Sequence, residues 1–205
     1  MSNRDDLLAG AKKVLLEKGY ARATARDIAQ ASGVSLAAIG YHFGSKDALM
    51  NQAMYQAIGE WGDQVEEAFA RAGGDLPAEE RFVRIYDELV ATFDENAALW
   101  MASFELIMQL DRIPGARELF EEALPQARTG MVDMVLGISE ENVDRDLEMS
   151  VGAVLYSLMA GTLIQRFADA ARTPTGADLA RGLRRLADAL DGKPVGLSRR
   201  SPSTD

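Results

Sequence analysis

Apolar side chains recur along this chain at the three- and four-residue spacing of amphipathic helices, and no stretch alternates as a half-buried strand does. The first helical pattern covers residues 4–18, where Leu7, Ala11 and Val14 fall on one face. Gly19 follows at the position where glycine ends a helix with a left-handed turn. Similar patterns continue nearly to the C-terminus and predict an all-α protein.

Two short helices are predicted next. Thr24 and Asp27 have the spacing of a capping box, which places the start of a second helix at Ala25. Gly33 interrupts that helix, and Val34 opens a third one. Two short helices around a glycine turn form a helix-turn-helix.

A long fourth helix is predicted over residues 46–72, with Ser45 as its N-cap. The sequence therefore predicts a helix-turn-helix domain over residues 1–45 and a second, all-helical domain over residues 46–191. Residues 192–205 are poor in apolar side chains and are predicted to be a disordered tail. Further helices of the second domain are expected near 77–95, 97–111, 114–136, 144–171 and 176–190.

Composition excludes several kinds of chemistry. The chain has no cysteine, and its one histidine is His42, which argues against a disulfide, a metal centre or a Ser-His-Asp triad. We therefore expect no enzyme, no metal and no cofactor. The N-terminus is acidic where a signal peptide is basic, and residues 151–164 look too short to span a bilayer. A cytoplasmic protein with no membrane partner is expected.

The charge is distributed unevenly. The formal net charge of the chain is −10 at pH 7, which by itself disfavours nucleic acid as a partner. Residues 1–50, however, contain seven Lys or Arg and five acids, so this segment carries +2 and the rest carries −12. A mildly basic N-terminal segment on an acidic body points to DNA as a partner of the first domain.

Many residues of the first domain match a known pattern. These are Gly19-Tyr20, Thr24, Asp27-Ile28-Ala29, Gly33-Val34-Ser35 and the run from Ile39 to Leu49, IGYHFGSKDAL. Over about residues 4–50 they closely resemble the DNA-binding head of the TetR family of transcriptional regulators. The resemblance implies an all-α homodimer, in which a fourth helix links the head to a domain that holds the dimer interface and a ligand pocket.

The third helix is expected to enter the major groove of DNA, with the second lying across the backbone. Apolar side chains at its start can pack on thymine methyl groups, and hydroxyl, imidazole and ammonium groups can bind bases or phosphates. Arg26 is equally well explained as an ordinary solvated charge, and Phe43 as a core residue. The candidate DNA-binding residues are Thr24, Arg26, Ser35, Leu36, Ala37, Ala38, Gly40, Tyr41, His42 and Lys46.

Large, adaptable side chains in the body suggest a pocket for an apolar ligand. A methionine-rich and aromatic stripe at helical spacing is also what an ordinary core requires. Glu105 would favour a cationic or hydroxylated ligand if it faced inward, and otherwise belongs to a solvated stripe. The candidate pocket residues are Trp61, Phe93, Trp100, Met101, Phe104, Glu105, Met108, Met134, Tyr156 and Met159.

The predicted helix over residues 144–171 is apolar on nearly every face, so it is expected to be central. Its stripe of small residues would let a partner helix approach closely, and the last helix is strongly amphipathic. An ordinary monomer core would explain the same pattern. The candidate dimer-interface residues are Ser150, Ala153, Ser157, Gly161, Leu179, Leu183, Leu186 and Leu190.

These observations predict a sequence-specific, DNA-binding regulator: a homodimeric repressor that an unknown small-molecule effector releases from a palindromic, double-stranded operator. The main alternative is a small-molecule-binding helical protein whose head no longer reads DNA. An architectural or protein-interaction factor is a third class, but it would need a more basic surface.

Overall fold

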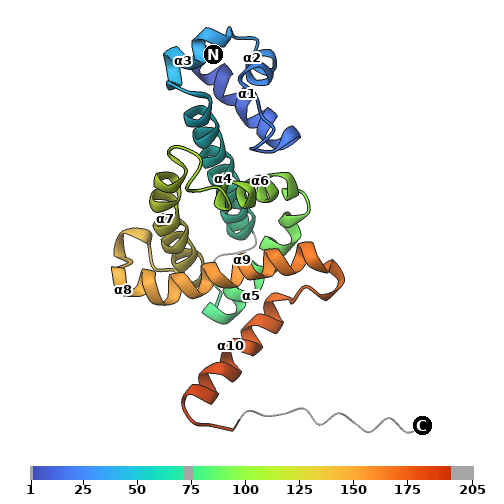
Figure 1. Ribbon diagram of the computed structural model, residues 1–205. Helices are drawn as coiled ribbons and strands as arrows, with labels where there is room; N and C mark the ends of the chain where they lie inside the picture. The colour runs from blue at the N-terminus through green and yellow to red at the C-terminus, as the bar shows by residue number, and fades with distance from the viewer. Residues whose placement is uncertain (1, 72–75, 195–205) are drawn as a thin grey trace, which may run out of the picture.

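The computed structural model describes residues 2–71 and 76–194, which form helices and turns with no strand among them. This confirms the all-α prediction. Figure 1 shows the N-terminal helices gathered at one end of the molecule, with the rest of the chain below them. The helices are α1 (Asn3–Lys18), α2 (Ala25–Ser32), α3 (Leu36–Phe43), α4 (Lys46–Arg71), α5 (Ala78–Phe93), α6 (Ala97–Ile107), α7 (Ala116–Leu136), η1 (Glu140–Asn142), α8 (Arg145–Leu147), η2 (Glu148–Gly152), α9 (Ala153–Ala168), η3 (Ala170–Arg172) and α10 (Gly176–Leu190).

Local hydrogen bonds set the boundaries of α2, as the sequence predicts. The Asp27 amide donates to Thr24 Oγ1 (3.2 Å), and the Thr24 amide donates to the Asp27 carboxylate (3.1 Å). This capping box starts the helix at Ala25. Gly33 ends it with φ 69° and ψ 12°, a left-handed conformation that glycine adopts at little cost.

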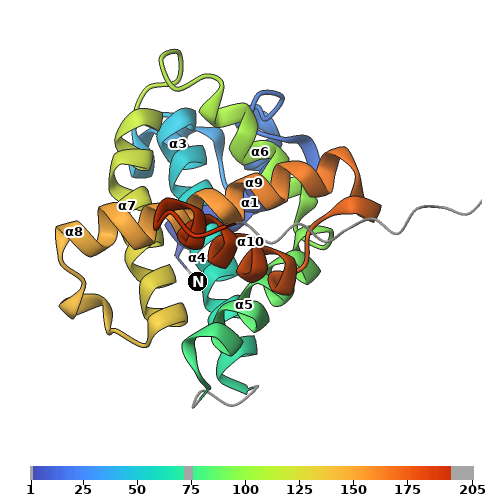
Figure 2. The same ribbon diagram turned by 90° about the horizontal axis from the view of Figure 1, so that it is seen from below.

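α4 connects the head, which we define as residues 2–45, to the body that follows. Ser45 Oγ accepts a hydrogen bond from the Ala48 amide (3.0 Å), which confirms Ser45 as the N-cap. The helix runs from the head down past α6 and α7 (Figure 1). Seen from below, α9 crosses the body and α10 lies outside it, toward the viewer (Figure 2).

One continuous apolar core runs through head and body. Leu7 of α1 and Ile28 of α2 are fully buried in it, and so are Phe93 of α5 and Leu106 of α6. Burial of this apolar surface is the main favourable contribution to folding. The head is therefore packed on the body rather than tethered to it.

The helix predicted over residues 97–111 ends earlier, at Ile107. From there the backbone forms tighter turns: the Gln109 amide donates to the Leu106 carbonyl (3.0 Å) and the Arg112 amide to the Gln109 carbonyl (2.8 Å). These turns place Leu110 and Ile113 against the core. The predicted continuation of the α-helix to residue 111 is wrong because the tighter turns replace its hydrogen bonds.

The helix predicted over residues 144–171 is interrupted. A π-helical turn, Glu148–Gly152, separates α8 from α9, and α9 ends at Ala168. The stretch Arg145–Ala168 has 24 residues, and an 18-residue window within it has a mean hydropathy of 1.5, so by length and composition alone it is sufficient to cross a membrane. Residues 151–164, expected to be too short, are part of this longer stretch, and the core helix of a soluble protein passes the same test. Of the predicted disordered tail, residues 195–205 lie outside the described part of the chain.

Candidate functional site

The start of α3 presents its side chains to solvent. Ser35, Leu36 and Ala37 are exposed, and 48% of the Leu36 surface is accessible. Ser35 makes no side-chain bond that caps α3. Ile39 points the opposite way and is buried in the head. The helix thus keeps one face in the core and leaves the face with the predicted base contacts open.

The other end of α3 carries an aromatic pair, of which Tyr41 is exposed and His42 is half-buried. Tyr41 is 86% exposed, and its ring meets the His42 ring edge to face, with centroids 4.8 Å apart. An aromatic ring that exposed buries almost no apolar surface in this chain, so core packing does not explain it. Phe43, by contrast, packs against the core, with the Arg4 guanidinium 5.2 Å from its ring centroid. Among the other predicted contacts, Arg26 of α2 and Gly40 of α3 are exposed and Ala38 of α3 is half-buried.

Two predicted phosphate contacts are engaged within the head. The Thr24 hydroxyl donates to the Asp27 carboxylate (2.7 Å). Lys18 also bonds that carboxylate (2.7 Å), and this bond, followed by those from Thr24, lowers the pKa of Asp27 to about 2. Lys46 lies over the Tyr20 ring, pairs with the neighbouring acid in α4 and is only partly exposed. Thr24 and Lys46 therefore also hold the head together.

The body brings three of the predicted pocket residues into one aromatic cluster. The Trp61 and Trp100 rings meet at 89° with centroids 4.6 Å apart, and Phe93 lies 6.2 Å from Trp100. Trp61 Nε1 donates to Thr92 Oγ1 (3.0 Å). Trp100 Nε1 is buried without a hydrogen-bond partner. A buried, unsatisfied N–H is costly, so this donor favours any ligand that offers an acceptor.

The other predicted pocket residues are divided between core and surface. Met159 is buried, and Phe104, Met134 and Tyr156 are partly buried against the core. Met101 and Met108 are 52% and 82% exposed, so they do not line an interior pocket in this structure. Glu105 is half-buried, and its carboxylate accepts a hydrogen bond from the Ala21 amide of the head (3.2 Å).

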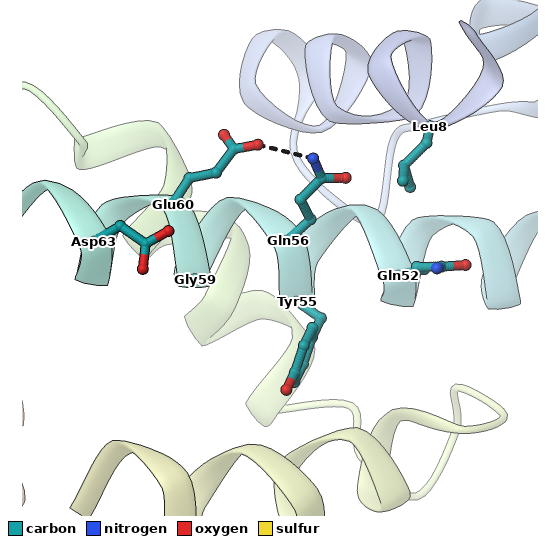
Figure 3. A pocket seen from close by; sticks show the side chains of 7 residues that line it. All are labelled: Leu8, Gln52, Tyr55, Gln56, Gly59, Glu60 and Asp63. Carbon is teal, nitrogen blue, oxygen red and sulfur yellow. Dashed lines mark hydrogen bonds between the residues drawn. The ribbon is translucent and has the colours of Figure 1, made fainter. Parts of the chain in front are cut away.

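A surface hollow of about 350 Å³ lies elsewhere, along α4 where it passes α1 (Figure 3). Leu8 of α1 closes one side, and Tyr55 of α4, which also lines the hollow, points away from α1 toward α7. Glu60 accepts from Gln56 (2.9 Å) and from Lys12 (2.6 Å), and the Lys12 bond lowers the pKa of Glu60. The hollow shares no residue with the predicted pocket.

The predicted dimer-interface residues form two groups. Ser150 and Ser157 are exposed, as are Leu186 (62%) and Leu190 (88%). Ala153 and Gly161 are half-buried. Leu179 and Leu183 pack on the core of their own chain, next to α5, where Leu183 and Phe82 line a hollow of about 200 Å³.

The sequence did not reveal the polar contacts between head and body. Asn51 of α4 is buried and accepts a hydrogen bond from the Tyr20 hydroxyl (2.5 Å). Its Nδ2 donates to the carbonyl of Pro114 (3.0 Å). A polar residue among the apolar positions of α4 was the available signal, because a buried amide needs partners.

Comparisons with known proteins agree with this geometry. The family model for bacterial regulatory proteins of the tetR family matches residues 7–53, which cover the head and the start of α4. The HTH-type transcriptional regulator CymR of Pseudomonas putida is 32% identical over 169 residues, 80% of this chain and 79% of that protein. The chain belongs to the tetR family of bacterial regulatory proteins.

As a member of the tetR family, the protein is a DNA-binding transcriptional regulator with a helix-turn-helix head. Solved structures share its fold. A transcriptional regulator from Pseudomonas aeruginosa PAO1 superposes with a TM-score of 0.64 at 19% identity, over 92% of this chain and 90% of that one. The multidrug binding protein EbrR, solved with proflavin, has a TM-score of 0.59 at 20% identity, over 90% of this chain and 99% of EbrR.

Proposed function

We propose that this tetR-family regulator is a homodimeric repressor that grips a palindromic operator with its two heads and leaves it when a small molecule binds the body. The exposed side of α3 carries the proposal. Leu36 and Tyr41 have little to pack against within the chain. A major groove offers thymine methyl groups to the first and hydrogen-bonding base edges and phosphates to the second.

The surface of α9 and α10 supports a dimer. Val154 and Ile164 of α9 are 48% and 55% exposed, and Leu190 at the end of α10 is 88% exposed. Such residues gain by being covered, and small residues such as Ser157 on the same helix allow close approach of a partner helix. Two heads bound one DNA turn apart hold DNA far more strongly than one.

The aromatic cluster of the body supports an effector site. Trp61, Phe93 and Trp100 form a buried apolar cluster, and the unpaired indole N–H of Trp100 provides one specific donor. EbrR, which shares the fold, is solved with the aromatic ligand proflavin. An effector lowers operator affinity only if it binds the DNA-free arrangement of the heads more tightly than the bound one. The protein works in the cytoplasm, where its DNA lies, and residues 46–191 form the effector and dimer domain.

Fluorescence anisotropy with labelled DNA from upstream of the protein's own gene tests the proposal, with a scrambled duplex and two salt concentrations as controls. We expect saturable, sequence-selective binding by two protomers per site. If the upstream DNA is not bound selectively, an operator is sought by selection from random duplexes. Failure to select any duplex would favour the alternative, a ligand-binding protein whose head no longer reads DNA. Equal binding to both duplexes, with the steep salt dependence of phosphate contacts alone, would also contradict the proposal.

Tyr41→Ala provides a residue-level test in the same assay. Loss of one base or phosphate contact per head is expected to weaken operator binding at least about tenfold, equivalent to roughly 1.4 kcal/mol. Because Tyr41 is 86% exposed, the thermal unfolding of the variant should match that of the wild type. Tyr41→Phe keeps the ring and removes the hydroxyl, so it separates the contributions of these two groups to operator binding.

A further inference from the structure

The body holds one turn of the head at two successive residues. The Ala21 amide donates to Glu105 Oε2 of α6 (3.2 Å). The Tyr20 hydroxyl donates to Asn51 Oδ1 of α4 (2.5 Å), and Asn51 Nδ2 donates onward to the Pro114 carbonyl (3.0 Å). Tyr20 and Ala21 belong to the turn between α1 and α2, so both contacts act at the same place in the head.

Both contacts also lead to one short segment, the first directly and the second through Asn51. Glu105 lies in the last turn of α6, and Pro114 precedes α7 by two residues. We call residues 105–114 the junction segment. Between its ends the backbone forms mainly three-residue turns in place of an α-helix, and Leu110 and Ile113 pack against the core. The junction segment is thus held to the head directly at Glu105 and, through Asn51, at Pro114.

The backbone is shaped for this close approach. At Gly19 a Cβ atom would lie 3.0 Å from Glu105 Oε2, and at Gly115 it would lie 3.1 Å from Asn51 Nδ2. Both glycines have positive φ, 79° and 76°, which other residues rarely adopt. A side chain at either position would push the carboxylate or the amide away from its partner.

The hydrogen bond that joins Asn51 to Tyr20 is buried and the one that joins it to Pro114 is partly buried, so both are costly to break. Asn51 is 7% exposed and Tyr20 is 2% exposed. Their polar atoms have no ready access to water, so a shift of the head or of Pro114 that broke these bonds would leave buried donors and acceptors unpaired. Such a link favours one discrete position of the head over a range of positions.

We propose that Glu105 and Asn51 are positioning residues for operator binding: they fix the angle of the head by tying the α1–α2 turn to the junction segment. Movement at the end of α6 or the start of α7 then reaches the head directly, as well as along α4. The proposal rests on the proposed function for its DNA readout. Neither residue contacts DNA in this role, so both act through the position of α3.

The first test compares three substitutions by operator anisotropy. Glu105→Ala removes the acceptor and is expected to weaken operator binding about tenfold, within the usual range of coupling between sites. Glu105→Gln keeps an acceptor oxygen and should remain within about twofold of the wild type. Glu122→Ala, on the exposed face of α7, removes the same charge and should bind like the wild type, which controls for long-range electrostatics.

The second test measures the position of the head without DNA. The chain has no cysteine, so Gln30→Cys in α2 and Glu121→Cys in α7, both at exposed positions, accept a pair of spin labels without further changes. Labelled chains are diluted in excess unlabelled protein so that each measured distance lies within one chain. We expect a narrow distance distribution for the wild-type background and a shifted or broader one with Glu105→Ala.

Tyr20→Phe tests the buried link in the same two assays. It removes only the hydroxyl and keeps the ring beneath Lys46, so it remains informative if Glu105→Ala does not fold. Wild-type distances and wild-type operator affinity in the folded variants would overturn the proposal. If the wild type itself selects no duplex, the proposed function fails, whereas the distance measurement still decides whether the junction segment positions the head.

Discussion

The head and the body of this regulator are both helical, but most of their helices begin in different ways. α1 and α2 start with complete capping boxes, at Ser2 and Thr24. α5, α6 and α7 start without any side-chain bond that caps them. α10, which stands outside the body and buries little, again has a capping box at Thr175. Local signals thus mark the starts of α1, α2 and α10, whereas α3 of the head and α5, α6 and α7 of the body begin without them and depend on packing.

The largest expected losses of stability come from core substitutions, which test whether head and body unfold as two units or as one. Phe93→Ala in the body should cost about 3–5 kcal/mol and Ile28→Ala in the head about 2–5 kcal/mol, because both side chains are fully buried. One core spans both regions, so each substitution should shift the whole unfolding transition. Trp61 and Trp100 report the body alone, and circular dichroism reports all helices. Loss of circular dichroism ahead of the fluorescence change in Ile28→Ala would show a separately unfolding head.

Substitution of one glycine in each region tests how closely the helices pack there. A Cβ at Gly10 would lie 2.7 Å from Ser32 Cβ, between α1 and α2, and a Cβ at Gly176 would run into the Val83 carbonyl of α5. Each change to alanine should destabilise the protein by about 1–3 kcal/mol. Gly10→Ala should also reduce DNA binding, whereas Gly176→Ala should reduce dimerisation because it displaces α10. Gly59 of α4 has open space around its Cβ position, so Gly59→Ala is the control and should stabilise by roughly 0.5–1 kcal/mol in chemical denaturation.

The capping boxes allow a matched pair of smaller changes. Thr24→Ala in the head and Thr175→Ala in the body each remove one box and should each cost about 1 kcal/mol. Only Thr24→Ala is expected to lower operator affinity, because α2 positions α3. Chemical denaturation and anisotropy measure the two effects. Equal operator affinity in the two variants would show that the start of α2 is not required for the position of α3.

The smallest expected effect concerns pH. Asp27 has its pKa lowered to about 2, mainly by the hydrogen bond from Lys18 and then by Thr24. A lowered pKa in the folded state means that the ionised carboxylate stabilises the fold above its unfolded pKa, about 3.9. This stabilisation is lost as the pH falls from about 4 to about 2. The thermal unfolding temperature of Asp27→Asn should therefore be lower than that of the wild type at pH 7. The difference between the two temperatures should shrink as the pH falls from about 4 to about 2. A constant difference would contradict the assignment.

The candidate site was predictable to different depths in the two regions. The face of α3 followed from the sequence because helical periodicity places Ile39 inside and Leu36 and Tyr41 outside. Glu105 was assigned to a pocket or to a solvated stripe, and the structure places it against the head instead. Periodicity gives the side of a helix on which a residue lies, but it does not give what faces that side.

The sequence by itself determined the all-α architecture, the start of α2 and the turn at Gly33, because capping and turn chemistry act within about four residues. Only the tertiary structure decided that α6 ends at Ile107, that Trp100 lies between Trp61 and Phe93, and that Asn51 joins Tyr20 to Pro114. The Ala21–Glu105 bond joins residues 84 positions apart in the sequence. Such contacts depend on how whole helices pack, and no local pattern specifies them.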